Sequence, residues 1–260
     1  MNGDGINRPA RDADAFALPG YRRAVLVEPE PGRVTALLED DIHCMAVRLD
    51  HARGVVTRAR AHADRMPWTT CPGAVAKLRE TFEGAALSEV TARRDKKANC
   101  THLHDMAVLA AAHAGDAAPL AFAIAASDPR DGVRILEIRR GGRAVHRWIE
   151  RDGQLVAPPP LAGSSLLTMR DWIASLEGAE QEAARLLQWA SLVAHGRTIP
   201  AARQSDASAM PPTCYTFQPD RAAHAQRTGV QYDFSTGSRR LLAGLRDRTR
   251  AALAGDRVGT

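Results

Sequence analysis

The residues best suited to chemistry lie together at Asn99-Cys100-Thr101-His102-Leu103-His104-Asp105, which holds a thiol, two imidazoles and a carboxylate. An apolar pattern that follows predicts a helix over residues 101–115. The start of a helix carries unpaired backbone N–H groups and the positive end of the helix dipole, which attract anions and lower the pKa of a thiol. The segment therefore predicts a reactive site, but it does not name a substrate.

Two histidines are the candidate acid and base. His43 alternates with Met45 and Val47 on one face of a predicted strand, and His102 begins a helix that must pack on the sheet. Both rings are expected to reach one pocket, where neutral and charged imidazole can divide the two roles near pH 7. Arg48 lies five residues after His43, so a regular pleat points it to the opposite face. The alternatives are two structural histidines and a solvated strand arginine.

A zinc site is a second interpretation of the same region. His43, Cys71, Cys100 and His102 offer the ligand types of a tetrahedral zinc centre, although their spacings of 28, 29 and 2 residues are irregular. The alternative, which is the commonest role of free cysteines, is that Cys71 and Cys100 are small buried hydrophobic residues. Cys100 as a nucleophile would need a base such as His43, because His102 points in a different direction at a helix start.

The C-terminal segment concentrates aromatic residues at 214–219 and 230–234, although only 5% of the chain is aromatic. Aromatic segments that follow a polar linker often fold back over a pocket or onto a partner subunit. Here Tyr215 and Phe217 could stack on an aromatic ring, and Gln218 could bond a phenol. The alternative is ordinary packing of a C-terminal arm. Arg48 is a further candidate for binding substrate: if a bulge brought it into the pocket, its guanidinium would hold a carboxylate or phenolate.

Composition excludes several classes of protein. The 260 residues are 45% hydrophobic and 25% charged, which is typical of a soluble globular protein. The net charge of +5 is spread along the chain, so we expect no nucleic-acid partner, and no apolar run is long enough for a membrane span. Four cysteines without a C-x-x-C pair or a signal peptide indicate the cytoplasm. Standard nucleotide-binding and hydrolase motifs are missing from the sequence, so we expect no cofactor.

Period-2 patterns and turn residues predict an α+β fold in which an antiparallel β-meander and a hairpin pack against several helices, with an extended C-terminal arm. The expected strands are residues 21–28, 33–39, 42–49, 55–63, 120–126, 133–140 and 143–151. The expected helices are residues 70–80, 101–115, 166–195 with a break at Gly178, and 239–254. The expected organisation is a disordered arm at 1–18, one domain at 19–196, a linker at 197–213, and the arm and last helix at 214–260.

A family resemblance covers residues 21–114. It is carried by His43-Cys44-Met45-Ala46-Val47-Arg48-Leu49, by Cys71, and by Cys100-Thr101-His102-Leu103. These residues resemble the His-x-Met-x-x-Arg-Leu strand, lone cysteine and Gly-Cys-Thr-His-Leu box of a bacterial family known only as domain of unknown function 2889. The chain departs from that pattern in having Asn99 for the glycine, and it lacks an aspartate-rich opening after Tyr21.

The resemblance implies a reaction, because distant relatives of that family look like cofactor-free lyases of lignin-derived biaryls that release formaldehyde. It implies a carbon–carbon lyase that acts on a small lignin-derived aromatic alcohol by acid–base chemistry. Separately from the resemblance, a homo-oligomer is expected, with a homodimer as one form that the sequence leaves open. His43 and His102 are the expected catalytic residues, and Arg48, Tyr215, Phe217 and Gln218 the expected substrate-binding residues. Two other functions stay open: a zinc-dependent hydrolase or zinc-stabilised domain, and a non-enzymatic binding protein.

Overall fold

The structure, a computed structural model, describes residues 13–94, 96–199 and 206–253. Its contacts divide these residues into two compact units. The first unit holds residues 13–23, 122–199 and 233–239, and the second holds residues 24–121, 206–232 and 240–253. Most of the predicted N-terminal arm, residues 1–12, and part of the predicted linker, residues 200–205, lie outside the described residues.

The prediction of an α+β fold is confirmed, because antiparallel strands are combined with several helices. The meander of the second unit runs through β2 (Arg33–Asp40), β3 (Cys44–Ala52) and β4 (Val55–Arg65), next to the part of β1 (Gly20–Glu30) from residue 24 on. Each of these pairs with its successor in the order of the chain, as short connections favour.

The register of the meander assigns each side chain to a face. Thr35 pairs with Arg48, and Leu37 pairs with Ala46. Partners that lie directly opposite each other point to the same face of a sheet, and successive residues alternate between faces. One face, which we call the Arg48 face, therefore holds the odd-numbered residues of β2 and the even-numbered residues 44–50 of β3. The other, the Met45 face, holds the remaining residues of both strands.

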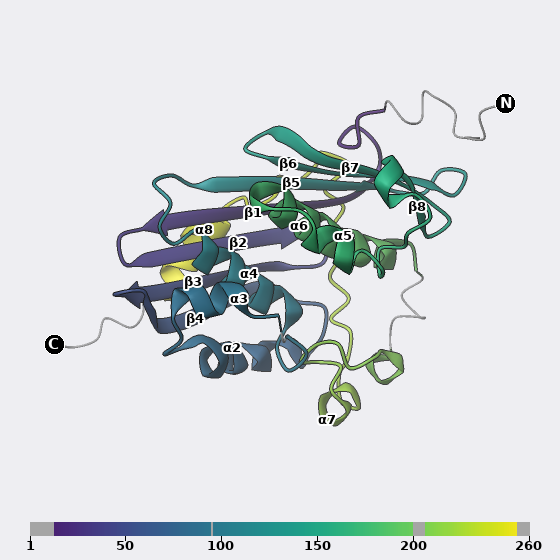
Figure 1. The fold of residues 1–260 in the computed structure, drawn as a ribbon. Coiled ribbons are helices and arrows are strands. Elements are labelled where there is room, and N and C mark those ends of the chain that lie inside the picture. Colours follow the sequence, from purple (N-terminus) through teal and green to yellow (C-terminus); the bar gives the residue numbers. More distant parts are fainter. Residues whose placement is uncertain (1–12, 95, 200–205, 254–260) are drawn as a thin grey trace. The chain divides into compact units, whose positions relative to one another are not determined.

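Helices cover both faces of this meander. On one side lie α2 (Ala74–Phe82), α3 (Leu87–Ala92) and α4 (Thr101–Ala112), with the short η1 (Cys71–Gly73) before them. On the Arg48 face, Leu245 of α8 (Leu245–Leu253) packs on Leu37, Cys44 and Ala46. Figure 1 shows α8, in yellow, behind the strands and α4 in front of them. The Met45 face and the Arg48 face therefore belong to two separate layers of side chains.

The first unit is built on a second antiparallel ladder. It contains β5 (Leu120–Ser127), β6 (Val133–Arg140), β7 (Arg143–Arg151) and β8 (Gln154–Ala157), and the sequence did not predict β8. The predicted Gly141-Gly142 hairpin is present, with positive φ angles of 56° and 83°. The helices are η2 (Pro159–Leu161), α5 (Arg170–Ala174), α6 (Gly178–His195) and η3 (Gly196–Thr198). A fully buried Trp148 meets Trp172 edge to face.

The C-terminal arm contributes η5 (Ala207–Ala209) and α7 (Pro219–Ala222) to the second unit, before α8. The predicted last helix, 239–254, is shorter in the structure, since α8 begins at Leu245. Within the described ranges, no helix has the length and apolar character needed to cross a membrane.

We predict that the packing of α8 stabilises the second unit. Leu245 is fully buried, so Leu245→Ala should lower the free energy of unfolding by about 2–5 kcal/mol, because it removes apolar contacts and leaves a cavity. The matched control is Val230→Ala, whose side chain is 45% exposed, and which should change stability by less than about 0.5 kcal/mol. Urea unfolding followed by circular dichroism measures both. Equal effects of the two variants would contradict the packing described for α8.

Candidate functional site

The turn between β2 and β3 is held by one buried carboxylate. The Asp40 side chain is fully buried, and its Oδ1 accepts hydrogen bonds from the backbone N–H of Ile42 at 2.8 Å and of His43 at 2.7 Å. The backbone N–H of Asp40 in turn donates to the carbonyl of His43 at 2.9 Å. An aspartate that bonds the backbone two and three residues ahead closes a tight turn. The turn therefore fixes the position of His43 immediately before β3.

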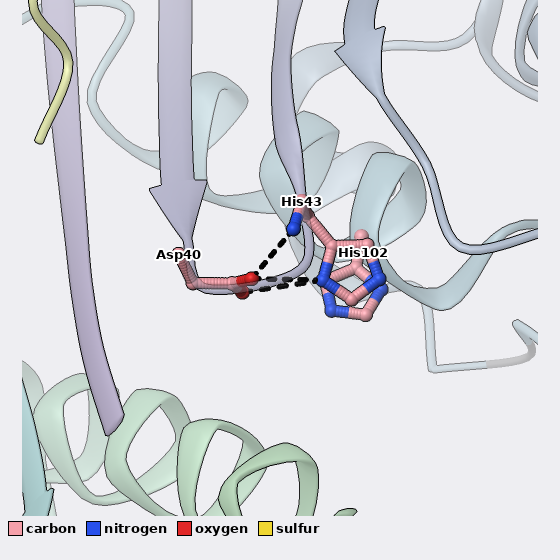
Figure 2. Close-up of side chains that lie close together, drawn as sticks. All are labelled: Asp40, His43 and His102. Carbon is pink, nitrogen blue, oxygen red and sulfur yellow. Dashed lines mark hydrogen bonds and ion pairs between the residues drawn. The ribbon is translucent and has the colours of Figure 1, made fainter. Parts of the chain in front are cut away.

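The same carboxylate also orients the ring of His43. Nδ1 of His43 lies 3.1 Å from Oδ1 and 3.2 Å from Oδ2 of Asp40. A carboxylate only accepts hydrogen bonds, so the geometry assigns the proton to Nδ1 and leaves Nε2 as the basic nitrogen. Figure 2 shows Asp40 directed at both the backbone and the ring of His43. Asp40 thus fixes the tautomer and the orientation of this imidazole.

The second imidazole lies against the first. His102, in the first turn of α4, stacks on His43 with ring centroids 3.8 Å apart and an angle of 29° between the planes (Figure 2). One ligand atom from each of Asp40, His43 and His102 falls within 4.8 Å of the other two. The two histidines expected from the sequence are therefore in contact, and both are nearly buried, at 6% and 8% exposure.

Two residues that the sequence analysis did not select support this turn. The Arg65 guanidinium donates to the carbonyl of Asp40 at 2.5 Å and of His43 at 3.1 Å, and it pairs with Glu39 at 3.3 Å. The Tyr232 ring covers that guanidinium at 4.2 Å. The Tyr232 backbone N–H also donates to the carbonyl of Asp41 at 2.7 Å. The cluster of aromatic residues at 230–234 was the available sequence signal for Tyr232, whereas nothing marked Arg65.

The sequence left two interpretations of the Cys100 thiol, a nucleophile and a small packed residue, and its buried surroundings favour the second. Burial raises the pKa of Cys100 to about 12, because loss of solvent outweighs the hydrogen bonds from the backbone of Leu103 and His102. Burial also raises the pKa of Cys71, whose sulfur lies 3.3 Å from Oγ1 of Thr216. Both groups are therefore neutral thiols near pH 7, which disfavours them as nucleophiles.

The predicted zinc set does not assemble as proposed. In the described part of the chain, the side chains whose ligand atoms converge are Asp40, His43 and His102, and Cys71 and Cys100 are not among them. Cys71 instead faces the C-terminal arm through Thr216. The carboxylate of Asp40, rather than either thiol, therefore lies beside the two histidines.

The predicted substrate-binding residues lie in two places. Arg48 is on the opposite face from Met45, where its guanidinium bonds Asp50 at 2.9 and 3.0 Å. The sequence predicted that a regular pleat would point Arg48 to the face opposite His43. The structure has that pleat, so Arg48 lies on the side of α8, away from the layer of Met45. The other three predicted residues, Tyr215, Phe217 and Gln218, belong to the C-terminal arm and lie beside η1 and the start of α4.

Contacts of the arm explain its position. The Tyr215 backbone N–H donates to the carbonyl of Asn99 at 2.8 Å, and a Cβ on Gly73 would lie only 2.6 Å from the Tyr215 hydroxyl. Phe217 meets Trp68 edge to face at 5.8 Å. The Gln218 amide donates to the backbone carbonyls of three residues, Lys97, Pro212 and Cys214. The arm is therefore tied to the segment that leads into His102.

Two further residues at the start of α4 have structural roles. Asn99 is buried, and its Oδ1 accepts a hydrogen bond from Thr81 at 3.0 Å, so it joins α2 to the segment that meets Tyr215. His104 is 1% exposed and packs on the Phe82 ring, with centroids 5.3 Å apart. Of the two imidazoles in this segment, only His102 therefore contacts His43.

The raised pKa values of the thiols predict slow labelling and a defined pH dependence. At pH 8 the cysteines of the folded protein should react slowly with a chromogenic disulfide reagent, and unfolding in urea should release all four. A thiol whose folded pKa lies above its ordinary value of 9.0 stays protonated when the unfolded chain ionises, so stability should fall as the pH rises from about 9 to 12.

Unfolding midpoints at several pH values test this slope. The variant Cys100→Ala should make this fall in stability with pH less steep, because it removes one of the two thiols with the largest rise in pKa and leaves Cys44. Fast labelling of Cys100 in the folded protein at pH 7 would contradict the assignment.

Of the comparisons with known proteins, the one with protein families found a match. Residues 28–115 match the family described as "Protein of unknown function (DUF2889)". Neither a curated protein nor a solved structure is significantly similar to the chain. The matched segment contains Asp40, His43 and His102 and ends soon after α4, whereas Tyr215 and Tyr232 lie beyond it. The family match therefore covers the whole histidine cluster but not the arm that packs near it.

Proposed function

We propose that the protein is an acid–base enzyme whose reacting groups are the imidazoles of His43 and His102. The observation that carries this proposal is the contact of Asp40 with His43 and of His43 with His102. A carboxylate that fixes the tautomer of one histidine, together with a second histidine in contact, is suited to moving protons.

His43 is proposed as the base. Its Nδ1 hydrogen bond to Asp40 leaves Nε2 free to take a proton from a substrate hydroxyl. The imidazolium that forms would be stabilised by the carboxylate of Asp40, in the same way that the aspartate of a catalytic triad acts. Arg65 and Tyr232, which hold the turn, act as positioning residues through Asp40 and His43.

His102 is proposed as the acid. Its place in the first turn of α4 is set by the packing of that helix, so the 3.8 Å contact with His43 does not depend on a flexible loop. Two stacked imidazoles disfavour a second positive charge beside the first, so one ring would hold a proton while the other accepts one. This division of roles is what an acid–base pair requires.

The substrate class rests on the family resemblance. We propose a small lignin-derived aromatic alcohol with a para-hydroxyphenyl ring, a benzylic hydroxyl and a neighbouring hydroxymethyl group. The reaction starts from the phenolate, after the phenol proton has passed to solvent; loss of the benzylic hydroxyl as water, with the proton from His102, then gives a quinone methide. His43 then takes the proton of the hydroxymethyl group, the carbon–carbon bond breaks, and formaldehyde leaves. The bonding pair forms a new carbon–carbon double bond and restores the phenolate, so the net products are formaldehyde, water and an alkene.

The arm residues are the proposed contacts for the aromatic ring. Tyr215 is tied to Asn99, three residues before His102, and Phe217 lies on Trp68, so this segment presents aromatic side chains beside the start of α4. Arg48 is less suited to this role than the sequence suggested, because its guanidinium is engaged by Asp50 on the other face. The amide nitrogen of Gln218 is likewise engaged by backbone carbonyls.

The proposal predicts the effect of removing each group. His43→Ala and His102→Ala should each lower kcat for formaldehyde release by about 10²–10⁴-fold, the usual contribution of a positioned acid or base. Asp40→Asn should also lower kcat, since an amide no longer fixes the same tautomer. The measurement is formaldehyde by a colorimetric assay, with the alkene followed by chromatography, on a diaryl propanediol that carries a para-hydroxyl group.

A matched control is His224→Ala, since His224 is exposed and lies outside the cluster. Circular dichroism would verify that each variant is folded. Full turnover by both His43→Ala and His102→Ala would end the assignment of these residues. Absence of formaldehyde from every para-hydroxylated aromatic alcohol would end the proposed reaction, while leaving the acid–base site open to another substrate.

A second candidate function is a metal-dependent hydrolase, and the convergence of Asp40, His43 and His102 within 4.8 Å favours it. Two imidazoles and one carboxylate bind zinc or ferrous iron in many enzymes. In the structure, however, Asp40 bonds Nδ1 of His43, an arrangement typical of a residue that orients a ligand rather than being one.

Elemental analysis of the purified protein separates the two candidates. The acid–base proposal predicts substoichiometric metal, and turnover that is unchanged after dialysis against a chelator. One tightly bound zinc or iron per chain, lost together in His43→Ala and His102→Ala but retained in His224→Ala, would establish the metal site instead.

A further inference from the structure

A cavity lies on the face of the meander opposite to the histidine cluster. It encloses about 490 Å³ between the Arg48 face of the strands and α8, and it is lined only by residues of the second unit. This volume falls within the range of roughly 300–1,000 Å³ typical of small-molecule sites. The cavity is separate from the histidine cluster, because it belongs to the layer of Arg48 and α8.

The cavity has an excess of positive charge. Five arginines and three carboxylates line it, which leaves two positive charges in excess. Asp50 accepts hydrogen bonds from Arg33, Arg48 and Arg60 at 2.9–3.0 Å. Burial alone would raise the pKa of Asp50, but these three guanidinium groups outweigh it and lower that pKa.

The other two carboxylates in the lining are also engaged. Glu28 pairs with Arg246, and Glu30 pairs with Arg33 at 3.4 Å. The carboxylates of the cavity are thus committed to guanidinium groups of the protein. The uncompensated charge of the cavity is therefore positive.

Donors in the lining lack acceptors in the described part of the chain. The Thr249 hydroxyl is buried in a residue that is 3% exposed, and it has no hydrogen-bond partner there. Nε of Arg60 is buried without a partner as well, and the exposed Arg250 also lines the cavity. An unsatisfied buried polar group destabilises a fold, so its presence needs an explanation.

These donors can act together. Nη1 of Arg60 donates to the carbonyl of Leu253 at 2.7 Å, which holds the Arg60 side chain against the last turn of α8. Thr249 lies four residues before Leu253, on the same face of that helix. Thr249 and Arg60 therefore approach the same part of the cavity. Arg250 is the next residue of α8 after Thr249.

We propose that this cavity binds a small organic anion, whose carboxylate or phosphate group takes the hydrogen bonds of Arg60, Thr249 and Arg250. An oxyanion supplies several hydrogen-bond acceptors and negative charge. The lining of the cavity offers the matching hydrogen-bond donors and an excess of positive charge. The aliphatic side chains of Leu37 and Leu253 border the same space, so an organic group attached to the anion would contact them. The proposal does not depend on the acid–base function of the other face.

Isothermal titration calorimetry and thermal unfolding test the site, with inorganic phosphate and benzoate as probes and sodium chloride at equal ionic strength as the reference. The variants are Thr249→Val, which removes the hydroxyl at nearly constant volume, and Arg250→Gln. The matched control is Arg248→Gln on the same helix, because Arg248 pairs with Asp64 and does not line the cavity.

We expect a rise in Tm with at least one of the two anions in the unmodified protein and in Arg248→Gln. Thr249→Val and Arg250→Gln should each weaken binding at least tenfold. Binding of benzoate alone would assign a carboxylate, and binding of phosphate alone would assign a phosphate group. Without ligand, Thr249→Val should have a Tm equal to or above that of the unmodified protein, because it removes an unsatisfied hydroxyl.

Two results would overturn the proposal. One is the absence of binding by either anion above the chloride reference. The other is binding that is unchanged in both Thr249→Val and Arg250→Gln, which would place the anion elsewhere. A marked loss of stability in ligand-free Thr249→Val would also count against it, since that hydroxyl would then have a structural partner.

Discussion

The buried carboxylate of Asp40 is the group on which the histidine site depends. It accepts hydrogen bonds from two backbone N–H groups at the end of β2 and also holds the ring of His43, so one side chain sets both the turn and the orientation of that ring. A buried carboxylate is costly unless it is paired and hydrogen-bonded. These bonds meet that cost, and they make the direction of the His43 ring a consequence of the fold.

The alternation of side chains along the strands gives the second unit two separate layers. Residues of β2 and β3 on the Met45 face belong with α4 and the histidines, whereas those on the Arg48 face belong with α8 and the positively charged cavity. A shift of one residue in register would exchange these faces. The turn at Asp40 therefore contributes to both layers, since it fixes where β3 begins.

The predictable part of the structure followed from local patterns. Residues 33–39, 55–63 and 133–140 alternate, and turn residues bound them, so their strands could be placed within a few positions. The first turn of α4 and the choice of His43 and His102 also came from local signals. The sequence left Cys100 open as a nucleophile or a packed residue, and the burial that raises its pKa became visible only in the tertiary structure.

The sequence alone determined the α+β class, most strands and helices, and the two histidines, because periodicity and residue type are local properties. Tertiary structure decided which groups meet. Asp40, and not Cys71 or Cys100, lies beside the two histidines. Arg65 and Tyr232 pack at the turn, and Arg48 pairs with Asp50. Contacts between residues up to about 200 positions apart, such as that of Tyr232 with Asp41, depend on how the layers pack, which no local pattern encodes.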